Sequence, residues 1–150
     1  MARRVSLPSE VAGQCVFCGI ARGSQPASVV AESDDVLAFC DIQPVHPGHL
    51  LVIPRAHAGD LAELPEETGR SMWSLGQRLA GAVRASGLPC DGVNLFLADG
   101  AAAGQEVWHT HLHVIPRIAR DGMLRISANW SLPPRAALDE TAARVRAALG

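Results

Sequence analysis

The sequence of 150 residues contains no lysine and no tyrosine, so that all 13 of its basic residues are arginine. These absences exclude enzymes that work through a lysine Schiff base, a lysine adenylate or a tyrosine nucleophile. The GxSxG motif, the Walker A glycine loop and the GxGxxG fingerprint are absent as well. If this chain forms a covalent intermediate, we expect histidine or cysteine to carry it.

The charge and hydropathy of the chain also limit its partners. The formal net charge is −2, and no apolar run approaches the roughly 20 residues of a membrane helix. The opening MARRVSLPSE lacks the apolar core of a signal peptide. We therefore expect a cytoplasmic protein that binds neither nucleic acid nor membranes. In that setting the four cysteines are expected to be reduced thiols or metal ligands rather than disulfides.

The pattern of apolar residues predicts one domain of the α+β class. We expect residues 1–14 to form a flexible lead-in and residues 15–150 to form a single domain. The prediction is a mostly antiparallel sheet of about five strands, a long central helix over 65–86 and a C-terminal helix over 133–150. The five strands are expected within residues 28–33, 35–42, 48–55, 92–100 and 107–117.

The stretch EVWHTHLHVIPR, residues 106–117, places three of the six histidines at alternate positions, His109, His111 and His113. On a strand these side chains would share one face at intervals of about 6.5–7 Å. The other face would carry Trp108, Thr110, Leu112 and Val114 and pack on the core.

Two chemistries fit such a histidine face. The imidazoles would either bind a catalytic metal or include a nucleophile that attacks phosphorus, since neutral imidazole is available near pH 7. The preceding turn GAAAGQ, residues 100–105, favours phosphate, because its backbone N–H groups and Gln105 can approach anionic oxygens. A metal hydrolase would need a nearby carboxylate base, and strand alternation points Glu106 to the other face.

Taken together, GQEVWHTHLHVIPR, DIQPVHPGHLLVIPRAH and CVFCGI resemble the histidine-triad (HIT) superfamily, and within it the Hint-like bacterial proteins. The resemblance runs from Cys15 to Arg117. It implies a HIT-like fold, a homodimer in the family manner, and a nucleotide hydrolase or nucleotidyl transferase that acts at the α-phosphorus. A covalent nucleotidyl-histidine intermediate would form and then release a nucleoside monophosphate, from a purine nucleotide by preference.

The resemblance also assigns roles to individual residues. His111 would be the nucleophile, His113 its phosphate-contacting or proton-handling neighbour, and His49 a supporting residue. Asp41 would accept hydrogen bonds from the ribose hydroxyls. The phosphate would lie against Gln105, Glu106 and Val107, and the base among Phe17, Ile20, Phe39 and Ile42.

Zinc is expected in a structural role. In zinc-bearing relatives the first histidine of the motif is a ligand beside two cysteines and an upstream histidine. The matching residues are Cys15, Cys18, His57 and His109. Four protein ligands would close a tetrahedral site and leave no position for substrate.

The chain departs from the family pattern at two places. Ala98 replaces an asparagine found in many relatives, and Glu106 replaces a serine, so that two side-chain donors near the phosphate are lost. Two alternatives stay open: a nucleotide-binding regulatory module with weak catalysis, and a zinc hydrolase with the triad as ligands. Trp130 is read either as a core anchor or as a platform for the leaving group.

Overall fold

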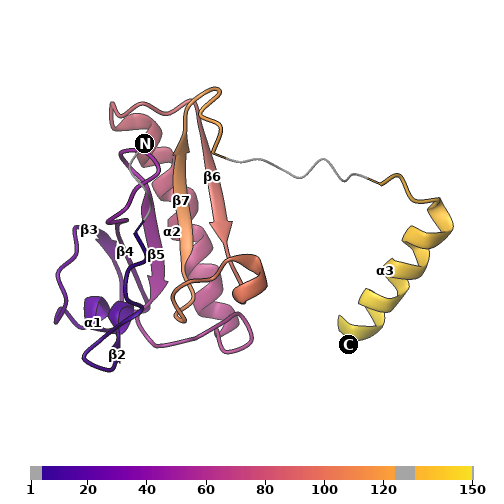
Figure 1. Cartoon of the computed structure of the whole chain (residues 1–150), viewed down its shortest axis with the longest axis horizontal. Coiled ribbons are helices and arrows are strands. Elements are labelled where there is room, and N and C mark those ends of the chain that lie inside the picture. The colour runs from indigo at the N-terminus through magenta and orange to yellow at the C-terminus, as the bar shows by residue number, and fades with distance from the viewer. Residues whose placement is uncertain (1–4, 124–130, 150) are drawn as a thin grey trace.

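The computed structural model describes residues 5–123 and 131–149, so Trp130 lies outside the described residues. Its centre is a five-stranded antiparallel sheet in the order β3-β4-β5-β7-β6, backed by the long helix α2 (Figure 1). This confirms the predicted α+β fold. The sheet strands are β3 Val29–Glu32, β4 Val36–Cys40, β5 Leu50–Pro54, β6 Gly92–Leu97 and β7 Leu112–Arg117; the helices are α1 Val16–Ala21, α2 Glu66–Ala85 and α3 Arg135–Leu149, with a 3-10 turn η1 at Ala101–Ala103.

Helix α2 follows its sequence signals closely. Glu66 and Glu67 lie in its first turn, at the positive end of the helix dipole, and Gly87 takes a φ of 82° just beyond its end. Pro65 precedes the helix as its N-cap rather than forming its first residue. One apolar stripe of this helix is buried against the sheet, and it consists of Met72, Leu75, Leu79 and Val83.

The sheet buries both of its faces over the central strands. One face packs on α2, where Val52 and Val114 are fully buried. The other face packs under α1, where Leu37, Phe39 and Ile53 surround Phe17. Burial on both faces explains why β4 and β5 are continuous apolar runs rather than alternating ones.

The histidine segment differs from the prediction. Strand β7 begins only at Leu112, so that His113 alone of the three histidines lies on a strand. Upstream, the N–H of Thr110 donates to Ala58 O at 2.7 Å and its hydroxyl donates to the same oxygen at 3.0 Å, which draws this segment away from the sheet. The predicted core position of Trp108 is therefore wrong, since its side chain is half exposed.

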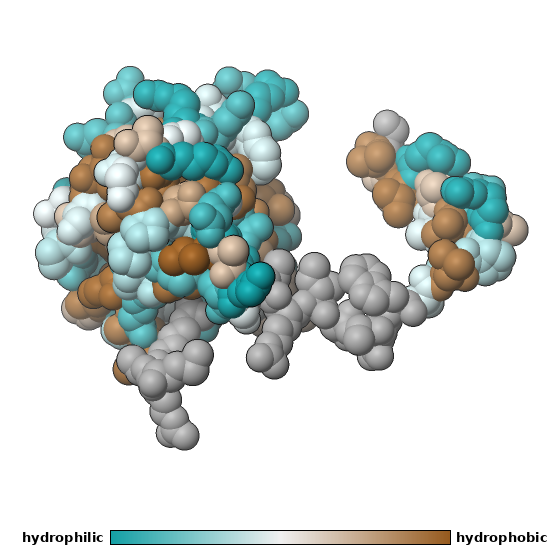
Figure 2. All heavy atoms as spheres, turned by 90° about the horizontal axis from the view of Figure 1, so that it is seen from above, coloured by the Kyte–Doolittle hydropathy of each residue, from teal (hydrophilic) through white to brown (hydrophobic). Residues whose placement is uncertain are grey.

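The ends of the chain add three elements. A short hairpin pairs β1 Glu10–Val11 with β2 Gln14–Cys15, directly before α1. Helix α3 lies where the C-terminal helix was predicted, but it has no buried residue, and apolar side chains lie on its open surface (Figure 2). Among the described residues, no helix combines the length and the apolar character that a membrane crossing requires.

Candidate functional site

A cavity of about 630 Å³ opens on the sheet face that carries α1. Volumes of this size are typical of small-molecule sites. Nine of the ten predicted nucleotide-binding residues line it. The apolar ones are Phe17, Ile20, Phe39, Ile42 and Val107, and the polar ones are Asp41, Glu106, His111 and His113. Because β7 starts late, strand alternation does not govern Glu106, and the prediction that it faces away from the histidines is wrong.

His111 lies at the wall of this cavity with only 6% of its surface exposed. Its Nδ1 lies 2.8 Å from the carbonyl oxygen of His109, and since a carbonyl only accepts, Nδ1 carries the proton. The ring packs edge to face on Phe17, with centroids 5.3 Å apart. Burial lowers the pKa of His111, so at neutral pH the ring is neutral and Nε2 keeps its lone pair.

His49 fixes the protonation of His113 in the same way. The N–H of Val45 donates to His49 Nδ1 at 3.2 Å, so the proton of a neutral His49 is on Nε2. That Nε2 lies 2.9 Å from His113 Nδ1, which must accept, and the proton of neutral His113 is therefore on its Nε2. The rings of His111 and His113 are neighbours, with centroids 4.9 Å apart.

Asp41 lines the cavity and lies beside His49. One carboxylate oxygen accepts from the N–H of Gln43 at 2.8 Å, and the other lies 3.5 Å from His49 Nε2. Asp41, His49 and His113 thus gather three ligand-type atoms within 4.8 Å. Two nitrogen ligands on one tetrahedral zinc would lie about 3.3 Å apart. The shorter separation of 2.9 Å between His49 and His113 is that of a direct hydrogen bond instead.

Gln105 does not line the cavity, unlike the other residues predicted for phosphate contact. Its carboxamide oxygen accepts from the N–H of Gly100 at 2.8 Å, and its nitrogen donates to the carbonyls of Gly59 and Val107 at 2.7 and 3.1 Å. The turn that it closes needs left-handed backbone at Gly100 and Gly104, with φ of 90° and 87°. Gln105 therefore shapes the loop that precedes His109.

The four predicted metal ligands, Cys15, Cys18, His57 and His109, lie close together in the structure. Cys15 Sγ and Cys18 Sγ each lie 3.5 Å from His109 Nδ1, and Cys18 Sγ lies 3.3 Å from His57 Nδ1. A tetrahedral zinc with its usual bond lengths would hold sulfur and nitrogen about 3.6 Å apart. His109 donates its Nε2 proton to the carbonyl of Pro54 at 2.8 Å, which leaves Nδ1 free to face the cysteines.

Electrostatics also fit a cation at this cluster. Burial lowers the pKa of His109 to about 4, so the ring is neutral and ready to act as a ligand. Burial, together with the neighbouring Cys15, raises the pKa of the Cys18 thiol. A divalent cation would lower the pKa of both thiols, because it stabilises their thiolate forms.

The structure adds cavity residues that the sequence did not single out. Leu7 and Pro8 line one wall, although they belong to the lead-in. Gln43 holds this segment in place: its carboxamide accepts from the N–H of Val5 at 2.8 Å and donates to Val5 O at 2.7 Å. Gln25 lines the wall after α1. Isolated residues of this kind carry no periodic signal that would reveal them.

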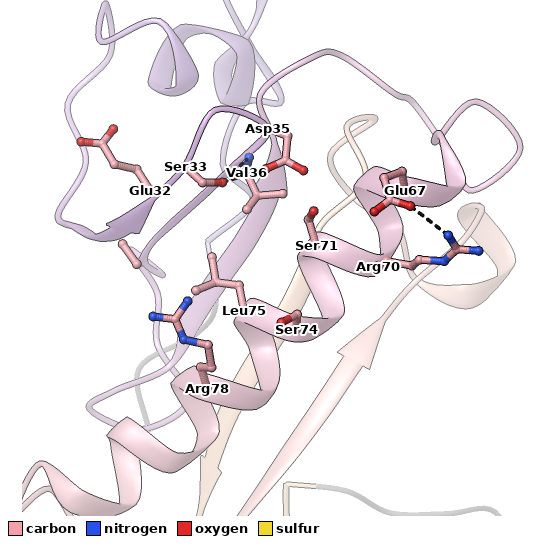
Figure 3. Close-up of a pocket in the computed structure, with 11 residues that line it drawn as sticks. Glu32, Ser33, Asp35, Val36, Glu67, Arg70, Ser71, Ser74, Leu75 and Arg78 are labelled. Carbon is pink, nitrogen blue, oxygen red and sulfur yellow. Dashed lines mark hydrogen bonds and ion pairs between the residues drawn. The ribbon is translucent and has the colours of Figure 1, made fainter.

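A second hollow, of about 500 Å³, lies between the β3–β4 turn and α2, away from the histidines (Figure 3). Its acidic side chains already form ion pairs or hydrogen bonds with other side chains of the protein. Glu67 pairs with Arg70, as the dashed line in Figure 3 marks, and Glu32 pairs with Arg55. Hydroxyl groups of Ser71 and Ser33 lower the pKa of Asp35. The candidate site is therefore the cavity at His111.

Comparison with known proteins agrees with this geometry. The HIT domain model matches residues 22–120. An uncharacterized HIT-like protein of Mycobacterium tuberculosis is 45% identical over 102 residues, which are 68% of this chain and 70% of that protein. The adenylylsulfatase HINT3 of Arabidopsis thaliana is 41% identical over 114 residues, 75% of this chain and 57% of that protein.

A solved structure agrees as well. The crystal structure of a Zn-bound histidine triad family protein from Mycobacterium smegmatis is 41% identical and superposes with a TM-score of 0.70. The match covers 85% of this chain and 96% of that one. The predicted family is thereby confirmed: this chain belongs to the HIT domain family.

Proposed function

We propose that this protein is a nucleotide hydrolase or nucleotidyl transferase that acts at the α-phosphorus and forms a covalent intermediate on His111. The observation that carries the proposal is the hydrogen bond from His111 Nδ1 to the carbonyl of His109, 2.8 Å long. It leaves Nε2 of a buried, neutral ring as the nucleophile at the wall of a cavity that fits a nucleotide.

In the first step His111 Nε2 bonds to phosphorus, and the bond to the leaving group breaks with its electron pair. The Nε2–H of His113 donates a hydrogen bond to the departing atom or to a phosphate oxygen. The leaving group takes up a proton from solvent as it departs. In the second step water bonds to phosphorus, the nitrogen–phosphorus bond breaks, and water releases one proton to solvent. His111 returns to neutral imidazole, and the nucleoside monophosphate leaves.

The other side chains hold the substrate. The carboxylate of Asp41 is proposed to accept from the ribose hydroxyls, and Phe17, Ile20, Phe39 and Ile42 to surround the base. The backbone at Glu106 and Val107 is proposed to meet the phosphate in a loop whose shape Gln105 maintains. His49 acts through His113 and is a positioning residue.

The zinc belongs to the structure of the site rather than to the reaction. We propose that Cys15, Cys18, His57 and His109 hold one zinc ion, as their spacing fits. A relative is known with zinc bound. The ion would fix His109, whose carbonyl oxygen orients the nucleophile. Since His109 turns toward the cysteines, the geometry favours this arrangement over a hydrolytic zinc held by all three histidines.

The phosphorus–heteroatom bond that breaks is proposed to be that of a phosphoramidate, an acyl or sulfo adenylate, or a dinucleoside polyphosphate. All of these share the reacting centre, and the adenylylsulfatase relative supports the class. A panel of such compounds, scored by the monophosphate released, identifies the leaving group.

The function is tested by His111→Ala with adenosine 5′-phosphoramidate. We expect turnover to fall below detection while AMP still binds, because the variant loses the nucleophile but keeps the cavity walls. His46→Asn is the control, since His46 contacts Asp121 outside the cavity and should leave turnover unchanged. Turnover by His111→Ala would refute the mechanism. AMP binding without turnover of any compound by the wild-type protein would indicate a regulatory binding module instead.

We also propose that two copies pair along β6. This strand forms an edge of the sheet, and its Phe96 is 45% exposed. Its ring lies 5.9 Å from the ring of His113, so a second copy would lie beside the site. Sedimentation should show a dimer that Phe96→Glu disrupts and that Val30→Glu, on the other edge strand, does not.

A further inference from the structure

Gln25 has a fixed backbone at the wall of the cavity. It follows α1 in a turn that folds back on the carbonyl oxygen of Gly19. The backbone N–H groups of Ser24 and Gln25 donate to this oxygen at 2.9 and 3.1 Å, and the hydroxyl of Ser24 lies 3.2 Å from it. These contacts set the direction in which the side chain of Gln25 leaves the chain.

The stem of Gln25 is held as well. A Cβ atom placed on Gly19 would lie 2.6 Å from Cγ of Gln25 and 3.4 Å from its Cβ. The side chain therefore lies directly against the buried backbone of α1, at a position where only glycine leaves room. Gly19 has an ordinary backbone conformation, so its lack of a side chain matters here for space and not for φ.

The carboxamide at the end of this stem forms no hydrogen bond with any described residue. Gln25 is half-buried, and the next residue in the chain, Pro26, offers no side-chain partner. A carboxamide whose stem is fixed and whose polar atoms have no partner among the described residues is able to pair with a ligand in the cavity. A carboxamide offers a donor and an acceptor side by side.

Gln25 and His111 line the same cavity, and α1 lies against both of them. The ring of Phe17 packs on His111, and Gly19, two residues further along α1, packs on Gln25. We propose that the carboxamide of Gln25 forms hydrogen bonds with the N7 edge of the base and thereby favours adenine. This inference rests on the proposed function. The N6–H and N7 of adenine match a carboxamide with two hydrogen bonds, whereas O6 and N7 of guanine are both acceptors.

The test compares the dissociation constants of AMP, GMP and ribose 5-phosphate by calorimetry. We expect the wild-type protein to bind AMP about tenfold more tightly than GMP, which is about 1.4 kcal/mol. Gln25→Met keeps an unbranched stem but removes both hydrogen-bonding atoms, and should bring this ratio near one. Ribose 5-phosphate should bind both proteins equally, because it has no base.

A second variant tests the role of Gly19. Gly19→Ala should lower the AMP preference by displacing Gln25, and it should have no further effect on the ratio in the Gln25→Met background. Gly81→Ala is the control, because a Cβ there meets no atom within 4 Å. A wild-type protein that binds neither nucleotide would overturn the proposed function together with this inference. Equal binding of AMP and GMP by the wild type, or an unchanged preference in Gln25→Met, would overturn the role of Gln25 alone.

Discussion

Gly76 sets the distance between α2 and the strand that carries His113. It is buried in the middle of α2 and faces Leu112, the first residue of β7. A Cβ atom at this position would lie 2.8 Å from Cδ2 of Leu112, closer than packed carbon atoms approach. Leu112 is itself buried and lies between His111 and His113, so its displacement would reach the site.

The change Gly76→Ala therefore has two opposing effects on stability. Overpacking a buried contact costs about 1–3 kcal/mol. Alanine in place of glycine within a helix contributes about 1 kcal/mol in the other direction. We expect a net loss of about 0–2 kcal/mol in the free energy of unfolding, with reduced turnover because Leu112 shifts the histidines beside it.

The variant Gly81→Ala separates the gain in helix propensity from the cost of overpacking. Gly81 lies on the exposed side of the same helix, where a Cβ meets nothing within 4 Å, so this variant gains helix propensity without a clash. By urea unfolding the two variants should differ by about 1–3 kcal/mol. In a chain of this length, each 1 kcal/mol is worth about 2–4 °C in Tm. Equal stabilisation by both substitutions would refute the close packing of α2 on β7.

Two further predictions concern the cluster of Cys15, Cys18, His57 and His109 and the ion pair of Arg117 with Asp121 at the end of β7. Cys18→Ala should lower bound zinc, measured by metal analysis, from one ion per chain toward none, and should lower Tm because a ligand of the native state is lost. Chelator treatment should reduce activity only as the protein unfolds. Asp121 accepts hydrogen bonds from Arg117, which holds the pKa of its carboxyl below the usual range. Since the pKa is lowered by folding, its stabilising effect is full at neutral pH and declines as pH falls below about 4. Asp121→Asn should therefore be less stable than the wild type at pH 7, by urea unfolding, with a smaller difference at pH 3; an equal difference at both would contradict this assignment.

The sequence predicts the elements of this fold well, because each signal is local. The turn at Ser33–Asp35 and the stripe of α2 depend on residues a few positions apart. The course of the chain before β7 depends instead on Thr110, whose two bonds to Ala58 cross from another segment. Strand alternation therefore failed for Trp108 and Glu106.

The candidate site divides in the same way. Motif resemblance predicted the residue types that line the cavity and the four that gather in the cluster of two cysteines and two histidines. It did not reveal what Gln105 contacts, since its carboxamide is used by Gly100, Gly59 and Val107. Nor did it place Leu7 in the cavity wall, because the segment is held there through a side chain distant in the sequence, that of Gln43.

The proposed mechanism is tested most directly by looking for a bond between phosphorus and Nε2 of His111. The wild-type protein would be mixed with adenosine 5′-phosphoramidate, quenched while turnover is in progress, and weighed intact by mass spectrometry at mildly alkaline pH, where phosphorus–nitrogen bonds survive. We predict added mass equal to one adenylyl group, located on the peptide that holds His111, lost in acid and missing from His111→Ala. Released AMP with no such adduct at any quench time, or an adduct on another residue, would contradict it.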